Sequence, residues 1–99
     1  MSAADLLDAW NNELTNSRRR SPHTVRAYLA CARRLLAARE FSDWPSIARL
    51  EARDLRSHLA ARRAEGLANT SAARELSAIK SFIQFARVQS GEQDAAAPR

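Results

Sequence analysis

The chain has little of what breaks helices and little of what carries catalysis. Its 99 residues include 2 Gly, 3 Pro, 2 His and 1 Cys. Two glycines that stand 25 residues apart cannot form a Gly-rich phosphate loop. One cysteine excludes an internal disulfide and fits a reducing compartment. Because the histidines, the cysteine and the acids show no ligand spacing, we expect no metal and no other cofactor.

No residue pattern indicates an active site. Tyr28 is the only tyrosine and lies on an apolar helical stripe, which favours a place in the core over a nucleophilic role. Cys31 borders the same stripe, and no histidine in the sequence is visibly its partner. A half-buried structural thiol is therefore the expectation for Cys31. We expect no catalytic residue in this chain, and hence no enzyme.

Long hydrophobic runs are missing as well. No apolar stretch approaches the length of a signal-sequence core or of a membrane span. The sequence therefore predicts a soluble, cytoplasmic chain with no membrane partner.

What the sequence does contain favours helices. It has 21 Ala and no run of alternating Val, Ile and Thr. A chain of 99 residues is long enough for one modest core. We predict an all-α fold, a four-helix bundle over residues 1–90. Residues 91–99 lack apolar periodicity after the glycine, so they are expected to be a tail or the start of a linker.

Apolar spacing and start signals define the first two helices. The first is predicted over residues 2–16, with leucines and Trp10 on one side and acids in its first turns. Ser21 and Pro22 open the second helix, because serine caps and proline at the first position gives up an N–H that lacks a partner. That helix is expected to run to about Arg39.

The second half of the chain holds the third and fourth helices. Pro45 is expected to stop a helix at the preceding residue. A third helical region is expected to begin near Ile47 and to consist of one helix or two. Gly66 is expected to be the residue just after its C-terminus. The fourth helix spans residues 69–85, and any of its first three residues, Asn69, Thr70 and Ser71, is a candidate N-cap.

The apolar stripes of these helices predict a single core. Phe41 and Trp44 are expected to fold back on it as a plug, with stacking on nucleic-acid bases as the alternative for Trp44. The residues predicted to be buried together are Trp10, Tyr28, Leu29, Leu36, Leu55, Leu59, Leu76, Ile79 and Phe82.

Positive charge is concentrated in one part of the chain. The net charge is +5, and residues 17–40 alone sum to +6 while residues 1–16 sum to −3. A basic domain suggests an anionic partner, most often nucleic acid. An Ala- and Arg-rich composition can also mirror a biased genome, so the placement of the cations is the better guide.

Polar and basic side chains gather near the starts of the second and fourth helices, on faces opposite the apolar stripes. Arg34 shares this face of the second helix. Such groups beside a helix N-terminus fit a phosphate backbone or a major groove, and a solvated helix face is the alternative. The candidate DNA-contacting residues are Arg20, Ser21, His23, Thr24, Arg26, Thr70, Ser71, Arg74, Ser77 and Lys80.

Two stretches together carry a resemblance to a known family. Residues 21–28, SPHTVRAY, and residues 72–82, AARELSAIKSF, resemble the N-terminal core-binding domain of tyrosine recombinases, most closely the XerC group of the Xer type. Those proteins share Ser-Pro-x-Thr-x-x-x-Tyr at the start of the second helix and Arg-x-Leu-Ser-Ala-Leu-Arg-Ser-Phe in the fourth. The resemblance covers roughly Leu6 to Gly91. It implies a SAM-like domain that forms one half of a C-shaped clamp on double-stranded DNA. The second and fourth helices of this domain would face the major groove of a core half-site.

The resemblance also implies what lies outside the chain. The family's catalytic Arg, Lys, His and nucleophilic Tyr belong to a separate C-terminal domain, and the full-length proteins work with partner subunits in a synaptic tetramer, in chromosome-dimer resolution or DNA integration. The chain departs from the family at two places. Glu75 puts an acid beside Arg74, where it is expected to pair with that residue or to weaken DNA affinity. Ala97-Pro98 stands where relatives often have Asn-Pro.

Two functions from different classes are compatible with these observations. The first is a DNA-binding module of a site-specific recombinase. The alternative is a helical protein-interaction domain whose basic face binds an acidic partner. The cations lie at two helix N-termini flanked by Ser and Thr, rather than around an exposed apolar patch, which favours DNA.

Overall fold

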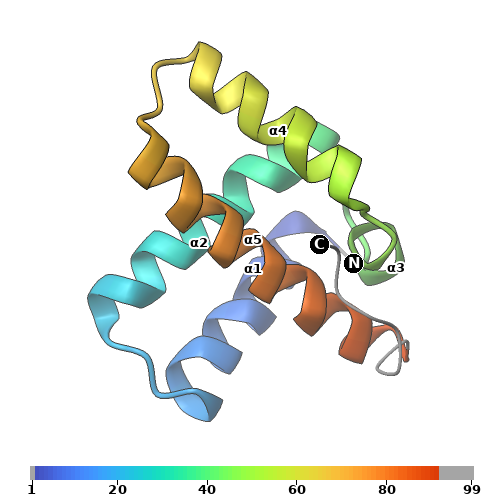
Figure 1. The fold of residues 1–99 in the computed structure, drawn as a ribbon. Helices are drawn as coiled ribbons and strands as arrows, with labels where there is room; N and C mark the ends of the chain where they lie inside the picture. The colour runs from blue at the N-terminus through green and yellow to red at the C-terminus, as the bar shows by residue number, and fades with distance from the viewer. Residues whose placement is uncertain (1, 92–99) are drawn as a thin grey trace.

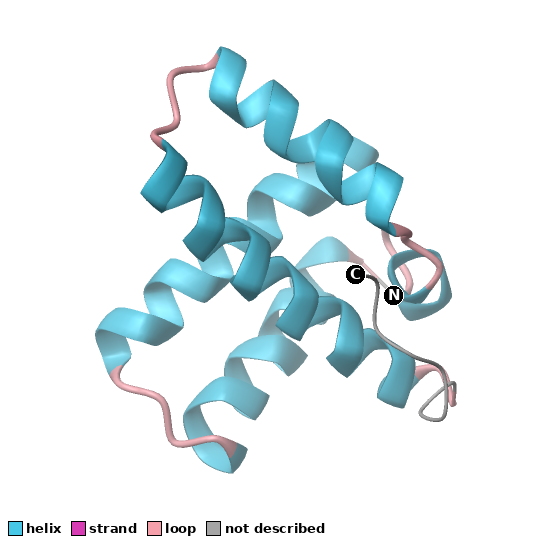
Figure 2. Ribbon diagram, viewed as in Figure 1, coloured by secondary structure: helices cyan, strands magenta, loops and turns pink. Residues whose placement is uncertain are grey.

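A computed structural model describes residues 2–91, and in this range all regular structure is helical (Figure 2). The predicted all-α bundle is confirmed. None of the described helices has the length and hydropathy that crossing a membrane requires. Of the expected tail or linker at residues 91–99, only Gly91 is among the described residues. Ala97-Pro98, where the chain departs from the family, lies outside them. The elements are α1 (Ala3–Asn12), η1 (Glu13–Ser17), α2 (Pro22–Arg39), α3 (Trp44–Ala48), α4 (Ala52–Ala64) and α5 (Asn69–Gln89).

The first predicted helix changes its winding near its end. Ser2 caps α1, and the Asp5 carboxylate accepts a hydrogen bond from the Ser2 N–H at 2.8 Å. From Glu13 the chain continues in the wider π-helical winding of η1, where the Arg18 N–H donates to the Glu13 carbonyl at 3.0 Å. The predicted single helix over residues 2–16 is therefore α1 followed by one π turn.

The third helical region is two helices, α3 and α4, so the described residues form five α-helices where four were expected. The prediction for Pro45 was wrong. Pro45 lies in the first turn of α3, a position that needs no N–H, and Asp43 caps this helix by accepting the Ser46 N–H at 2.8 Å. Gly66 follows the C-cap of α4 with a φ of +102°, as predicted, because this left-handed conformation suits glycine.

Helix α5 is the centre of the bundle. It contacts α2, α3 and α4, and Figure 1 shows it crossing in front of α2. Its N-cap is Ala68, which has no acceptor side chain. The prediction that Asn69, Thr70 or Ser71 caps this helix was therefore wrong, since all three already lie in its first turn.

The core lies beneath α5 and is built around aromatic rings. Trp10 and Phe82 are both 0 % exposed, with ring centroids 5.5 Å apart. Trp44 folds back on Phe82 at 6.0 Å, which confirms the predicted plug. Leu36, Leu55 and Ile79 are also buried in this core as predicted, whereas Leu59 is buried outside the core cluster. Tyr28, Leu29 and Leu76 are only partly buried, because they lie where the apolar stripes reach the surface.

A candidate nucleic-acid interface between α2 and α5

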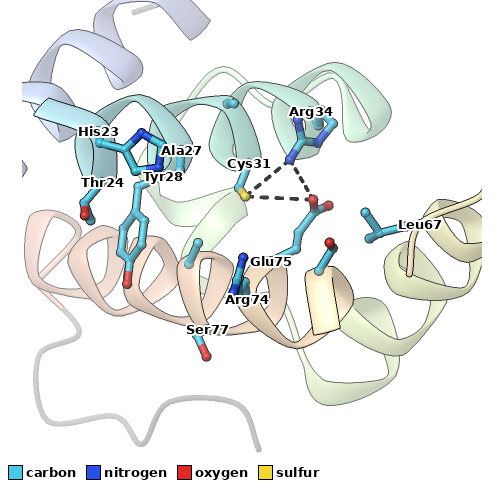
Figure 3. A pocket seen from close by; sticks show the side chains of 13 residues that line it. His23, Thr24, Ala27, Tyr28, Cys31, Arg34, Leu67, Arg74, Glu75 and Ser77 are labelled. Carbon is cyan, nitrogen blue, oxygen red and sulfur yellow. Dashed lines mark hydrogen bonds and ion pairs between the residues drawn. The ribbon is translucent and has the colours of Figure 1, made fainter. Parts of the chain in front are cut away.

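A groove with a volume of about 630 Å³ lies between α2 and α5 (Figure 3). Alanines at positions 27, 30 and 78 line it, and their small side chains leave the space open. Residues from both helices stand along it although they are far apart in the sequence. Five of the ten predicted contact residues line this groove: His23, Thr24, Ser71, Arg74 and Ser77.

The α2 end of the groove is fixed by a capped helix start. The Ser21 hydroxyl accepts the Thr24 N–H at 3.2 Å and donates to the Thr24 hydroxyl at 3.0 Å. The predicted capping role of Ser21 is therefore confirmed, and its hydroxyl is already engaged within the chain. His23 is exposed beside this cap and Thr24 is partly buried, so both side chains are held at the start of α2.

The α5 end of the groove differs because no side chain caps the helix. The first N–H groups of α5 therefore lack a side-chain acceptor, which suits an anion. Arg74 and Ser77 are exposed on successive turns, and Lys80 follows them, partly exposed and outside the groove. Thr70 is exposed in the first turn and does not line the groove.

Two predicted residues lie elsewhere. Arg20 and Arg26 are exposed and line a separate hollow of about 290 Å³, together with Asn11 and Thr15. This hollow borders the other flank of the α2 start. The structure therefore brings Arg20 and Arg26 together, but not with the groove residues.

A buried ionic cluster that was not predicted from the sequence lies in the wall of the groove. Glu75 is 2 % exposed, and its carboxylate accepts hydrogen bonds from Arg34 Nη2 at 2.7 Å and Arg62 Nε at 3.1 Å. His58 Nε2 lies 3.0 Å from the same carboxylate. Glu75 therefore pairs with residues of α2 and α4, and the predicted pairing with Arg74 was wrong. Among the residues drawn in Figure 3, no hydrogen bond or ion pair joins Arg74 to Glu75.

The surroundings of Glu75 keep its carboxylate ionised. Burial alone raises the pKa of Glu75, but hydrogen bonds from Arg34 and His58 and the charges of Arg34 and Arg62 outweigh it. The pKa of Glu75 is therefore below its ordinary value. One signal in the sequence pointed to this burial, since position 75 falls between Ala72 and Ile79 on the apolar stripe of α5.

Cys31 and Arg34 complete this wall of the groove. Cys31 is 8 % exposed, more buried than predicted, and its sulfur accepts a hydrogen bond from Arg34 Nη2 at 3.3 Å. Burial raises the pKa of the Cys31 thiol, which keeps it protonated and unreactive. Arg34 is partly exposed on the predicted face but is not free there, because its Nη2 donates to Glu75 and Cys31 in the wall of the groove (Figure 3). Within residues 2–91 no group of three or more His, Cys, Asp or Glu could hold a metal ion.

Comparison with known proteins gives a family match and several relatives. The profile of the family described as phage integrase, N-terminal SAM-like domain, matches residues 7–90. Over 89 residues the chain is 44 % identical to a tyrosine recombinase XerC of Methylobacterium sp. (strain 4-46), covering 83 % of this chain and 28 % of that protein. Over 82 residues it is 40 % identical to a tyrosine recombinase XerC of Mycobacterium sp. (strain KMS), covering 82 % of this chain and 27 % of that protein. The chain thus spans little more than a quarter of the length of these relatives, and no solved structure matches it.

Proposed function

Because the chain belongs to the family of phage integrase N-terminal SAM-like domains, we propose that it is a DNA-binding module of a XerC-like tyrosine recombinase. In this proposal α2 and α5 face the major groove of a recombination half-site. The groove between them carries the proposal, since it gathers hydrogen-bonding and basic side chains from two helix starts on one open surface.

Charge supports DNA as the partner. Residues 17–40, which include all of α2, sum to +6. The remaining residues sum to −1, which gives the net charge of +5. Among the described residues, Glu75 is the one acid that lines the groove, and its carboxylate is paired with Arg34 and Arg62, so it does not repel a phosphate as a free carboxylate would. The departure from the family at this position is therefore compatible with DNA binding.

The surface also argues against a hydrophobic partner at this groove. Within the described residues, Val88 is the one large apolar side chain that is well exposed, at 45 %. It stands near the end of α5, away from the groove lining. A protein interface of the usual kind buries an apolar centre of large side chains, whereas the apolar lining of this groove is mostly alanine, with Tyr28 and Leu67 as its larger members.

The proposal extends to the whole recombinase. Residues 1–90 form the core-binding domain, and residues 91–99 begin the linker to a separate domain that carries strand cleavage. The complete protein acts in the cytoplasm on double-stranded DNA, with partner recombinase subunits in a synaptic tetramer. Its role is chromosome-dimer resolution or DNA integration.

We expect this 99-residue chain to bind duplex DNA weakly and to break no strand. With on the order of five phosphate contacts, log K should fall by about 4.5 for each tenfold rise in salt, since each contact contributes about 0.9. Fluorescence anisotropy with a labelled duplex at several salt concentrations measures this slope. An affinity independent of salt would contradict the proposal, and covalent attachment to a nicked duplex would show that the chain itself performs chemistry.

Arg74 and Lys80 should have different roles on DNA. Arg74 lies one turn inside α5, close enough to its open N-terminus to reach base edges in a major groove. Arg74→Ala should cost about 1–3 kcal/mol on the cognate site and reduce the preference for it. Lys80 lies two turns further and carries a flexible point charge. Lys80→Ala should weaken binding to every duplex alike and lower the salt slope by about one.

Competition between cognate and scrambled duplexes at two salt concentrations separates these effects. Each variant is the control of the other, because both remove one cation from α5. If Arg74→Ala leaves the ratio of cognate to scrambled affinity unchanged, α5 only positions the domain, and base recognition belongs to α2, at His23 or Arg26, or to the other domain.

A further inference from the structure

The guanidinium of Arg34 has hydrogen-bonding capacity that the chain itself does not use. Both of its side-chain hydrogen bonds come from one nitrogen, Nη2, which donates to Glu75 and to Cys31. Its Nε is buried and has no partner within residues 2–91, while the side chain as a whole is 38 % exposed. Arg34 lines the groove between α2 and α5, and also a second hollow of about 210 Å³ between α2 and α4. The chain thus holds the guanidinium through Nη2, and Nη1 is the nitrogen left to donate to a ligand, since it is neither buried nor hydrogen-bonded within residues 2–91.

The position of Arg34 along α2 suggests which part of a duplex it meets. It follows His23 by eleven residues on one continuous helix. At 1.5 Å per residue this is about 16 Å, more than the width of a major groove, about 12 Å. If the start of α2 lies at the base edges, a residue this far along the helix lies over the sugar–phosphate backbone. An arginine there meets a phosphate, which its planar fork of donors fits well.

Glu75 fixes the orientation of this fork. Its carboxylate is itself held from α4, by Arg62 at 3.1 Å and His58 at 3.0 Å, so it is not free to follow Arg34. An exposed arginine loses rotamer freedom when it binds, and one that a buried carboxylate already orients loses less. Arg62 also shares the negative charge of Glu75, which leaves part of the Arg34 charge uncompensated.

We propose that Arg34 contacts a backbone phosphate of bound DNA and that Glu75 is the positioning residue that holds its guanidinium for this contact. The proposal rests on the DNA-binding function and assigns a part to two residues that were not among the ten predicted DNA contacts. It couples α4 to DNA binding through Arg62 and His58, although α4 itself does not line the α2–α5 groove.

The first experiment compares Arg34→Gln with Arg56→Gln. Arg56 is exposed on α4 and lies outside the groove, so its loss removes the same charge from another face. Anisotropy titrations of the 99-residue chain with a duplex should show the salt slope lowered by about 0.9 for Arg34→Gln, alike for cognate and scrambled duplexes, and unchanged for Arg56→Gln. Equal slopes for the two variants would overturn the phosphate contact.

The second experiment tests positioning through Glu75→Gln. This change removes a negative charge, so electrostatics alone predicts tighter DNA binding. If Glu75 positions Arg34, Glu75→Gln should instead weaken DNA binding and lower the salt slope as much as Arg34→Gln does. Combining the two substitutions should then cause no further loss of DNA affinity. The role of Glu75 would be overturned if Glu75→Gln bound DNA more tightly and Arg34→Gln still lowered the salt slope in the Glu75→Gln background. Circular dichroism confirms that the variants compared are folded.

A measurement on the unmutated chain covers the case in which Glu75→Gln does not fold. The Arg34 Nε–H signal, followed by NMR during titration with DNA, should shift at the same DNA concentration as the amides at the start of α5. An Arg34 signal that stays unchanged while those amides shift would overturn the proposal and leave the DNA-binding function standing. If no signal shifts, the DNA-binding function itself fails.

Discussion

Replacing Phe82 with alanine should lower the free energy of unfolding by about 3–5 kcal/mol, a large part of the about 5–15 kcal/mol expected for a whole domain. Phe82 is 0 % exposed, and its ring lies between those of Trp10 and Trp44, at 5.5 and 6.0 Å. Truncation would leave a cavity where α1, α3 and α5 meet, and rigid aromatic neighbours cannot fill it. Urea denaturation followed by circular dichroism measures the effect.

Val88→Ala on the same helix is the matched control for this prediction. Val88 is 45 % exposed, so losing its methyl groups should change the stability by no more than about 0.5 kcal/mol. An unchanged melting temperature for Phe82→Ala would mean that the buried face of α5 is assigned to the wrong side.

The buried faces of the long helices could be predicted from the sequence because helical periodicity is a local property. In α2 and α5 the spacing of Leu36, Ile79 and Phe82 identified side chains that the structure buries. The path of the chain around Pro45 could not be read in this way. Proline both ends helices and begins them, and the Asp43 cap that favours a start here acts through one short hydrogen-bonded turn.

The candidate site could be predicted only in part, because it is formed by two helices and helical periodicity describes one helix at a time. Periodicity shows which residues share a face of one helix, but not which helix lies opposite that face. His23, Thr24 and Arg74 were placed on polar faces, and the packing of α2 on α5 brings those faces to one groove. Arg26 belongs to the same helix start and yet lies on its other flank. Two of the partners of Glu75, His58 and Arg62, come from α4, whose position no local pattern gives.

Replacing Glu75 with glutamine should destabilise the domain by about 3 kcal/mol at pH 7, at the lower end of the about 3–5 kcal/mol for breaking a buried ion pair. The change leaves Arg34 and Arg62 without their shared carboxylate. Arg62 is only 18 % exposed and keeps Glu65 at 3.3 Å, while Arg34 is 38 % exposed and can turn toward water, which limits the penalty. Glu65→Gln is the control, because Glu65 is 63 % exposed and its loss should cost about 0.5 kcal/mol or less.

The loss caused by Glu75→Gln should depend on pH in a definite direction. The pKa of Glu75 in the folded chain lies below its ordinary value of 4.5. Between these two values the unfolded chain binds more protons, so the stability due to the carboxylate is fully present above about pH 4.5 and is lost as the pH falls through the folded pKa. Protonated glutamic acid is also close to glutamine in shape and charge. As Glu75 takes up its proton, the difference in unfolding free energy between the native chain and Glu75→Gln should therefore shrink as the pH falls below about 4.5. Urea denaturation curves of both proteins at a series of pH values below 4.5 measure this difference, and a difference that widened as the pH fell through this range would show that the carboxylate of Glu75 is not kept ionised between α2 and α4.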